Sequence, residues 1–270
     1  MTKRLLVIMP VINLWEQYTK WALQSLKCSE PWDFLLIDNG STDGTHEHVH
    51  TFRESAHAGF ADMVTVLRNE QNKGVSGSWN QGIKYGLEHG YTHFLILNND
   101  ILVHPHAIDG MLKRMDHGGV ALVAAVDISG ESRAPTEIFN MPDKEPSESP
   151  HPNFSCFMIT KDTIETVGWF DEVFFPGYFE DNSYHYRVKL IRGDNAAITT
   201  TTAMFYHFGS KTQNQDIGKP IVPGPQFEKN RTEFIKLWGG NPGQEQFKHP
   251  YNDATLYPYL QEDQTYRKLA

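Results

Sequence analysis

The chain has 270 residues, of which 39% are hydrophobic and 12% aromatic, so it can bury the core of one large α/β domain. Its formal net charge of -9 excludes a general attraction to polyphosphate. This charge is still compatible with a local basic groove and therefore with a nucleic-acid partner. Two cysteines far apart in the sequence, Cys28 and Cys156, argue against a disulfide framework and favour a cytoplasmic protein.

An apolar run at the N-terminus is interrupted by Pro10 and Asn13 and is too short to span a membrane. We interpret it as a buried first strand and not as a signal peptide, because no small-residue cleavage site follows it. We therefore expect a soluble protein, with contact to a membrane surface left open.

Apolar runs and helical segments alternate along the first half of the chain. The run from Arg4 to Met9 is continuous and ends at a proline, which is typical of a strand buried on both faces. Further strands are predicted at 33–37, 63–67, 93–97 and 120–126. Helices are predicted between these strands, the first one starting at Asn13. This order predicts an α/β fold with a doubly wound, mostly parallel sheet.

The pattern changes in the second half of the chain. Residues 129–152 are rich in Pro, Ser and Glu and predict a long loop. Residues 154–160 predict a strand, and Thr160 is a suitable cap for the helix that follows. Two strands are predicted on either side of the threonine run 199–202, which gives the sheet a small antiparallel part. A last helix is predicted at 226–238.

Two carboxylates, Asp38 and Asp100, directly follow predicted strands. Ligands of an open parallel sheet bind beyond the carboxyl ends of its strands, so both should point toward one crevice. Asp100 ends the tripeptide Asn98-Asn99-Asp100, which suits a divalent cation that bridges phosphates, although a plain β-turn is the alternative. Asp38 opens a segment that turn and capping chemistry explains by itself; its functional interpretation is a contact with a nucleobase or ribose.

The polar, glycine-rich loop after the third strand contains Asn72, Lys73 and Gly74, with Asn80 in the helix that follows. These residues form either a solvated loop or a polar floor beneath a nucleotide. Lys73 suits the second interpretation because its charge would offset that of a diphosphate.

Glu180 and Asp181 open a predicted helix after the apolar segment FFPGYF. The helix dipole explains acids in a first turn, but Asp181 shares a face with Tyr184 and Val188, where aromatic neighbours would desolvate it. A partly desolvated carboxylate is a suitable general base for a hydroxyl group. His207 ends a strand and is the histidine best placed to bind a metal, although a lone histidine is more often structural.

Taken in order, these segments resemble family 2 glycosyltransferases with the GT-A fold, above all the bacterial rhamnosyl- and galactofuranosyltransferase-like branch. The segments are LLVIMP, LLIDNGSTDGT, NEQNKGVSGSWNQGI, FLILNNDILV and GWFDEVFFPGYFEDNSYHYRVKLIRG, followed by YHFGSKT. The resemblance implies a nucleotide-sugar-binding catalytic domain over residues 1–212. Residues 213–270 are expected to be a mobile loop plus a short C-terminal helical and aromatic extension.

The resemblance also implies roles for single residues. Asp181 would be the catalytic base of an inverting displacement, and Mn²⁺ or Mg²⁺ would be bound by Asp100 and His207. The donor would be a UDP- or dTDP-sugar, bound by Pro10, Asp38, Asn72, Lys73, Gly74, Asn80, Asn98 and Asn99. The acceptor side would be formed by Trp169, Tyr178 and Glu180.

The chain departs from the family pattern in two places. Asn98 stands where the common metal-binding motif has its first aspartate, which weakens metal binding through that position. Asn182-Ser183-Tyr184 follows the two acids where many relatives have another acid, which affects the acceptor side.

Two alternative functions stay open, a nucleotidyltransferase and a non-catalytic nucleotide-sugar-binding module. The first would need a basic, glycine-rich phosphate loop near the first strand, and the second would have no use for Asp181. The acceptor is unknown: a glycan or lipid-linked precursor is the default, and a protein or a hydroxylated nucleobase is possible. Aromatic residues near the C-terminus form either an acceptor lid or a plain cap; they are Phe227, Phe234, Trp238, Tyr251, Tyr257 and Tyr259.

Overall fold

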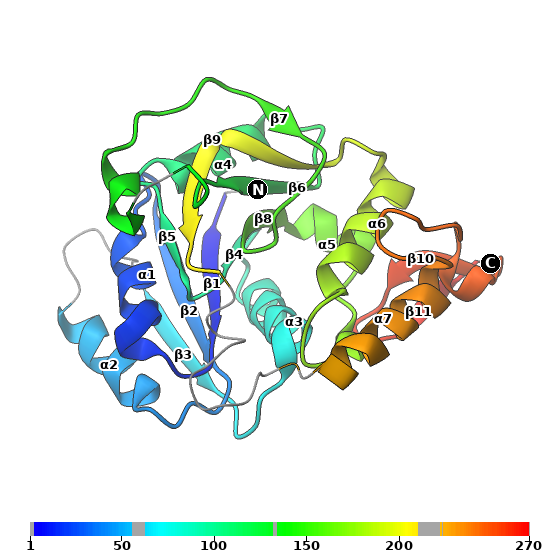
Figure 1. Cartoon of the computed structure of the whole chain (residues 1–270), viewed down its shortest axis with the longest axis horizontal. Coiled ribbons are helices and arrows are strands. Elements are labelled where there is room, and N and C mark those ends of the chain that lie inside the picture. The colour runs from blue at the N-terminus through cyan, green and yellow to red at the C-terminus, as the bar shows by residue number, and fades with distance from the viewer. Residues whose placement is uncertain (1–2, 56–62, 132–133, 210–221, 223, 270) are drawn as a thin grey trace.

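A mixed β-sheet with helices on both faces forms the centre of the molecule (Figure 1). The computed structural model describes residues 3–55, 63–131, 134–209, 222 and 224–269. The sheet runs in the order β3-β2-β1-β4-β8-β6-β9-β5, and β7 pairs with β9. The predicted α/β class is confirmed, and this sheet is the platform on which the candidate site is built.

Parallel strands form one half of the sheet: β1 (Leu5–Val11), β2 (Trp32–Asp38), β3 (Val64–Arg68) and β4 (His93–Leu97). Side chains alternate along β1, because successive residues of a strand point to opposite faces. Leu5 and Val7 belong to one buried cluster, whereas Leu6 and Ile8 belong to the other. The strand is apolar throughout because both of its faces are covered.

The other half of the sheet contains antiparallel pairs. β8 (Cys156–Thr160) lies between β4 and β6 (Leu122–Asp127) and is antiparallel to both. β9 (Ala197–His207) runs parallel to β6, and the short strand β5 (Ile101–Val103) is antiparallel to β9. Ile101 pairs with His207, so the segment after β4 meets the end of β9 although the two are far apart in sequence.

Helices pack against both faces of the sheet. One buried cluster includes side chains from α1 (Lys20–Ser25), α2 (Thr45–Ser55) and α4 (Ala107–Asp116). The other includes side chains from α3 (Gly74–Glu88), α5 (Lys161–Val167) and α6 (Glu180–Arg192). Within the described ranges, no helix has both the length and the apolar character needed to cross a membrane.

Helix α3 packs very close to the sheet because Gly82 and Gly86, which face the sheet, have no side chain. A Cβ added at Gly82 would lie 2.6 Å from Cγ2 of Ile8, and one added at Gly86 would lie 2.5 Å from Cε1 of Phe94. Neither position therefore accepts a larger residue without displacing the core.

The C-terminal elements pack beside α6, on the far side of the molecule from α1 and α2 (Figure 1). They are α7 (Gly224–Trp238) and a hairpin of β10 (Leu256–Leu260) and β11 (Tyr266–Lys268). Trp169 N donates a hydrogen bond to Leu260 O at 3.0 Å, and Trp238 Nε1 donates one to Ser183 Oγ at 3.0 Å. The predicted last helix is confirmed, whereas the predicted boundary after residue 212 and the loop after it fall on residues that the structure does not describe, apart from a few near its end.

The segment after β1 does not begin as a capped α-helix. Asn13, the predicted cap, instead accepts a hydrogen bond from Thr42 N at 2.8 Å through its Oδ1. The helical segment starts with a π-helical turn at Trp15–Thr19, before α1. Asn13 thus connects two loops, because its short amide side chain can replace a backbone acceptor.

Two other predictions in the second half of the chain were wrong in detail. The threonine run 199–202 lies inside the single strand β9, because pairing with β6 continues across a register shift. The long loop 129–152 contains a 3-10 turn at Pro135–Asn140 and the short strand β7 (Glu148–Ser149).

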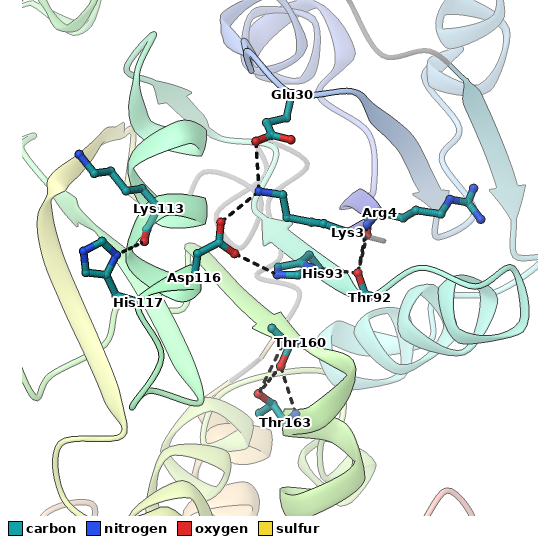
Figure 2. Close-up of polar contacts among 10 residues, drawn as sticks. All are labelled: Lys3, Arg4, Glu30, Thr92, His93, Lys113, Asp116, His117, Thr160 and Thr163. Atoms are coloured by element: carbon teal, nitrogen blue, oxygen red, sulfur yellow. Dashed lines mark hydrogen bonds and ion pairs between the residues drawn. The ribbon is translucent and has the colours of Figure 1, made fainter. Parts of the chain in front are cut away.

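Polar contacts join the amino-terminal ends of the central strands to their neighbours (Figure 2). Lys3 Nζ lies 3.2 Å from Glu30 Oε1 and 3.1 Å from Asp116 Oδ2, so it links the loop before β2 to the end of α4. Asp116 Oδ1 also lies 3.9 Å from Nε2 of His93, and burial lowers the pKa of that histidine. These contacts stabilise the end of the sheet where its parallel strands begin, opposite to their carboxyl ends.

A buried ion pair lies beneath the loop that precedes α6. Arg187 Nη2 is 3.0 Å from Asp171 Oδ2, and the two side chains are 0% and 3% exposed. Arg187 also donates to the carbonyl oxygens of Val167 and Trp169, at 2.9 and 2.6 Å. The other carboxylate oxygen of Asp171 accepts a hydrogen bond from Tyr266 Oη at 2.6 Å. The pair therefore joins the loop, α6 and the C-terminal hairpin.

Arg187→Met should lower the free energy of unfolding by about 3–5 kcal/mol, because it leaves the charge of Asp171 buried without a cation. Arg192→Met, on the same helix, is the matched control: its pair with Asp162 is exposed and contributes about 1 kcal/mol or less. Urea unfolding followed by circular dichroism measures both. Equal losses in the two variants would show that the buried pair does not hold this part of the fold.

Candidate functional site

A cavity of about 250 Å³ lies at the carboxyl ends of β1 and β4. Its wall combines the end of β1, the start of α3, the tripeptide after β4, the start of α6 and the end of β9. The lining includes Pro10, Ile12, Asn39, Asn72, Gly74, Trp79, Asn98, Asn99, Asp100, Phe154, Tyr178, Glu180, Asp181 and His207. This is the crevice in which open α/β sheets bind ligands.

Asp100 and His207 face each other at one side of the cavity. Asp100 is 2% exposed, and its Oδ1 lies 3.3 Å from Nε2 of His207. Burial lowers the pKa of His207, but the Asp100 carboxylate outweighs it, and the pKa is raised overall. Two ligands of one divalent cation stand about 3 Å apart, so this pair of oxygen and nitrogen atoms fits such an ion.

The two asparagines before Asp100 have different surroundings. Asn99 is buried, and its Nδ2 donates a hydrogen bond to Thr19 Oγ1 at 2.9 Å, which fixes the tripeptide against the first helical segment. Asn98 is half-buried, and its backbone N–H donates to Ser155 O at 2.9 Å. Its side chain stays available to the cavity, as an amide oxygen or an amide donor.

Glu180 and Asp181 lie together at the start of α6, along the same cavity. Glu180 is 6% exposed, and its Oε2 is buried without a hydrogen-bond partner. Burial, and next the charge of Asp181, raise the pKa of Glu180 well above its usual range. Burial also raises the pKa of Asp181, but backbone N–H groups, first that of Asn182, favour its charged form. Both carboxyl groups are therefore harder to ionise than in water, and Glu180 more so than Asp181.

The loop before α6 is held against the start of α3. Val75 N donates a hydrogen bond to Pro176 O at 2.8 Å. Gly74, the residue before Val75, has a φ of +73°, and a Cβ added there would lie 2.9 Å from Pro176 O. Only glycine combines this conformation with this contact, so Gly74 brings the two walls of the cavity together.

Asn80, a predicted donor-binding residue, does not line the cavity. Its Nδ2 donates to Phe170 O at 2.9 Å, and its Oδ1 accepts from Phe170 N at 2.9 Å. A further contact joins Nδ2 to Glu172 Oε1 at 2.9 Å. These bonds occupy both the nitrogen and the oxygen of the amide, so Asn80 joins α3 to the loop before α6.

Asp38 also lies outside the cavity lining, although it ends β2 as predicted. Its Oδ1 accepts a hydrogen bond from Ser41 N at 2.8 Å, and its Oδ2 lies 2.7 Å from Nη1 of Arg68. The side chain is fully buried. The local turn therefore uses this carboxylate, and the predicted contact with a nucleobase stays a prediction.

Two more predicted residues lie apart from the cavity. Lys73 and Trp169 line a shallow depression on another side of α3, together with Glu172 and Glu262. Phe234 and Trp238, considered for an acceptor lid, are fully buried against Phe174 and are part of a cap over the core.

Several lining residues were not predicted from the sequence. Asn39 follows Asp38 directly; its Nδ2 donates to Ser78 Oγ at 2.7 Å and its Oδ1 accepts from Asn69 at 3.0 Å. Phe154 and Ser155 reach the cavity because β8 pairs with β4 in antiparallel register. Asn39 could have been identified from the sequence, because it is polar and directly follows Asp38 in the same turn. Phe154 and Ser155 could not, because no sequence pattern indicates that β8 pairs with β4.

The cavity is acidic. Among the described residues that line it, Asp100, Glu180 and Asp181 are carboxylic acids and none is lysine or arginine. An anionic group entering this space therefore meets repulsion unless a cation comes with it. The arrangement suits a bound cation at Asp100 and a base at Asp181.

Comparison with known proteins gives one family. The model of the family described as "Glycosyl transferase family 2" matches residues 6–210. The low-salt glycan biosynthesis hexosyltransferase Agl10 of Haloferax volcanii is 24% identical over 174 residues, which are 58% of this chain and 53% of that protein. The chain thus spans about half the length of this curated relative.

Solved structures show the same fold. S. aureus TarS 1-349 in complex with UDP has a TM-score of 0.55 at 16% identity, over 86% of this chain and 71% of that one. GalNAc-T7 with UDP, GalNAc and Mn²⁺ has a TM-score of 0.59 at 12% identity, over 87% of this chain and 48% of that one. The predicted GT-A fold is confirmed by these glycosyltransferases.

Glu180→Gln should stabilise the protein at neutral and higher pH. A carboxyl whose pKa is raised in the folded state adds stability below its unfolded pKa and loses it as pH rises through the folded pKa. The amide has no such loss, so we expect its Tm to exceed that of the wild type by about 2–4 °C near pH 8. The difference should vanish near pH 4, about the ordinary pKa of glutamate.

Thermal unfolding across this pH range measures the effect. Glu165→Gln, at an exposed position of α5, is the control and should follow the wild type at every pH. A Glu180→Gln variant that is no more stable than the wild type near pH 8 would contradict the raised pKa.

Proposed function

The chain belongs to glycosyl transferase family 2, and on that premise we propose that it is an inverting, metal-dependent transferase that uses a nucleoside-diphosphate sugar. The observation that supports this most directly is the arrangement of two residue pairs along the same cavity. Asp100 with His207 forms one pair, and Glu180 with Asp181 forms the other. The first suits a cation at the diphosphate, and the second suits a base at the acceptor hydroxyl.

The charge of the cavity favours metal dependence. A nucleoside diphosphate is an anion, and the described lining residues offer it carboxylates but neither lysine nor arginine. Mn²⁺ or Mg²⁺ held by Asp100 and His207 would neutralise the diphosphate as it leaves. Asn98 is close enough in sequence to complete this ligand set with its amide oxygen, which is a weaker ligand than a carboxylate.

The different surroundings of the two acids support different roles. Asp181 is half-buried, and backbone N–H groups favour its charged form, so it would accept the proton of the acceptor hydroxyl as the hydroxyl oxygen attacks the anomeric carbon. The new bond forms as the bond between that carbon and the diphosphate oxygen breaks. Glu180 is buried, and burial raises its pKa well above the usual range, so its charged form, which would be the nucleophile, is disfavoured. This favours a single displacement with inversion over a covalent sugar-enzyme intermediate.

The donor would be bound at the start of α3 and the end of β1. Pro10, Asn72 and Gly74 line this side of the cavity, and they would contact the nucleotide together with Asn98 and Asn99. UDP is bound by both solved relatives, which supports a UDP- or dTDP-sugar with a hexosyl or pentosyl group. Asp38 would contact the base together with Arg68, which already occupies one of its carboxylate oxygens.

The acceptor would approach past the loop before α6. Val173, Phe175 and Tyr178 are 50%, 49% and 38% exposed there, and Tyr178 lines the cavity next to Glu180. An apolar rim of this kind suits a glycan or a lipid-linked precursor, which also fits contact with a membrane surface. The cytoplasmic location of the protein stays a prediction, which is based on its cysteine content.

We expect nucleoside diphosphate to be released from one donor of a nucleotide-sugar panel when Mn²⁺ or Mg²⁺ is present, and not in EDTA. Asp100→Ala should lower metal-dependent release at least about 100-fold, because the cavity then loses its carboxylate ligand. Asp162→Asn, at an exposed position, is the control and should keep full activity. Equal release in EDTA and in Mn²⁺ would exclude the metal-dependent mechanism.

Asp181→Asn should separate binding from chemistry. We expect the donor Kd, measured calorimetrically with Mn²⁺, to stay within a few-fold of the wild type, while kcat falls by about 10²–10⁴. A variant that keeps kcat would show that Asp181 is not the base. Donor binding by the wild type without turnover on any acceptor would instead favour a binding module.

A further inference from the structure

A second group of metal-binding side chains lies at the other end of β5, apart from the cavity lining. His104 directly follows β5, and His106 precedes the first residue of α4. Asp143 comes from the long segment between β6 and β7. His106 Nδ1 lies 2.9 Å from Asp143 Oδ1, and His104 Nδ1 lies 3.9 Å from the same oxygen. One ligand atom from each of the three residues lies within 4.8 Å of the others.

The hydrogen bonds of His104 determine which of its nitrogens can bind a metal. Its Nε2 lies 3.0 Å from Met141 O, and because a carbonyl oxygen can only accept, this nitrogen must be protonated. Nδ1 accepts a long contact of 3.3 Å from His106 N, so it has a lone pair. The ring is 3% exposed and cannot turn freely. Histidines that bind metals are oriented in this way, with the second nitrogen bonded to a carbonyl.

The spacing of the ligand atoms fits zinc. Tetrahedral zinc with bonds of about 2.0–2.1 Å has neighbouring ligand atoms about 3.3–3.4 Å apart. The two distances from Asp143 Oδ1, 2.9 and 3.9 Å, lie on either side of that value. Two imidazoles and a carboxylate are a ligand set that zinc favours over Mg²⁺.

The site is more than an exposed ion pair. The His106 and Asp143 side chains are 65% and 63% exposed, and a pair in that setting contributes little to stability by itself. Yet it lies where a long segment with little regular structure crosses β5, covering a small apolar cluster of Leu102, Ile138 and Met204. Strand β7 pairs with β9 and holds the far end of this segment, and a cation bound by Asp143 would attach its middle to β5 and α4 as well.

We propose that His104, His106 and Asp143 bind a zinc ion that fastens the segment between β6 and β7 to β5 and α4. Water would complete the coordination, because the outer side of the site is open to solvent. This site goes beyond the proposed transfer reaction and does not depend on it, since none of its ligands lines the cavity.

Zinc titration of the tag-free, metal-stripped protein tests the proposal, with calorimetry and the Tm as readouts. Asp100→Ala serves as the background in which the cavity pair is removed. In that background we expect one zinc ion to bind and to raise the Tm by about 5 °C at a hundred-fold excess over Kd. Adding His106→Asn or Asp143→Asn should weaken binding at least tenfold and reduce the Tm rise at the same zinc concentration to about half or less.

His117→Asn, an exposed histidine at the far end of α4, is the matched control and should bind zinc like its background. Equal Tm values of all variants in EDTA would show that the substitutions do not unfold the protein. The proposal fails if the Asp100→Ala background binds no zinc, or if His106→Asn and Asp143→Asn bind it unchanged. Neither result depends on whether the enzyme transfers a sugar.

Discussion

The buried pair of Asp171 and Arg187 is the interaction on which the half of the molecule with Glu180 and Asp181 depends. Charges removed from water must compensate each other, so the loop with Asp171 and the helix with Arg187 can only fold together. That helix starts with Glu180 and Asp181, and Tyr266 of the C-terminal hairpin donates to the same carboxylate. The family match ends at residue 210, yet the hairpin beyond it helps to position the proposed base. The C-terminal elements therefore belong to the architecture of the site.

The acidic cavity contains a buried carboxyl group, that of Glu180, which lowers the stability of the fold. Glu180 has a buried oxygen without a hydrogen-bond partner, and its charged form is disfavoured by burial and by Asp181. A core optimised for stability would replace it with an apolar residue. Retaining it places two acids of different pKa side by side, and the proposed role of Asp181 as a base would depend on this difference. The same excess of negative charge explains why a cation would be needed before an anionic donor could enter.

The short strand β5 joins the two groups of side chains proposed here to bind metal ions. Asp100 immediately precedes it, His104 immediately follows it, and its pairing with β9 brings His207 next to Asp100. The strand is buried and antiparallel to β9, so its two ends project to different parts of the surface. A cation at either end would restrict the same backbone. The proposed zinc would thus hold the segment that follows the proposed metal ligand Asp100, at a place apart from the cavity lining.

The sequence by itself determined the alternation of strands and helices, the cap at Thr160, and the strand-end location of Asp100. These features depend on local patterns: apolar runs, capping residues and the direction of parallel strands. Only the tertiary structure decided which polar residues face the cavity. Asn80 and Asp38 had suitable chemistry, but neither lines the cavity. The amide of Asn80 is bonded to Phe170, and the carboxylate of Asp38 is bonded to Ser41 and Arg68. The β10–β11 hairpin was likewise unpredictable, because its short strands have little apolar alternation and are held by contacts such as that of Leu260. A local sequence pattern indicates which ligands a residue could bind, whereas the packed fold determines which atoms that residue contacts.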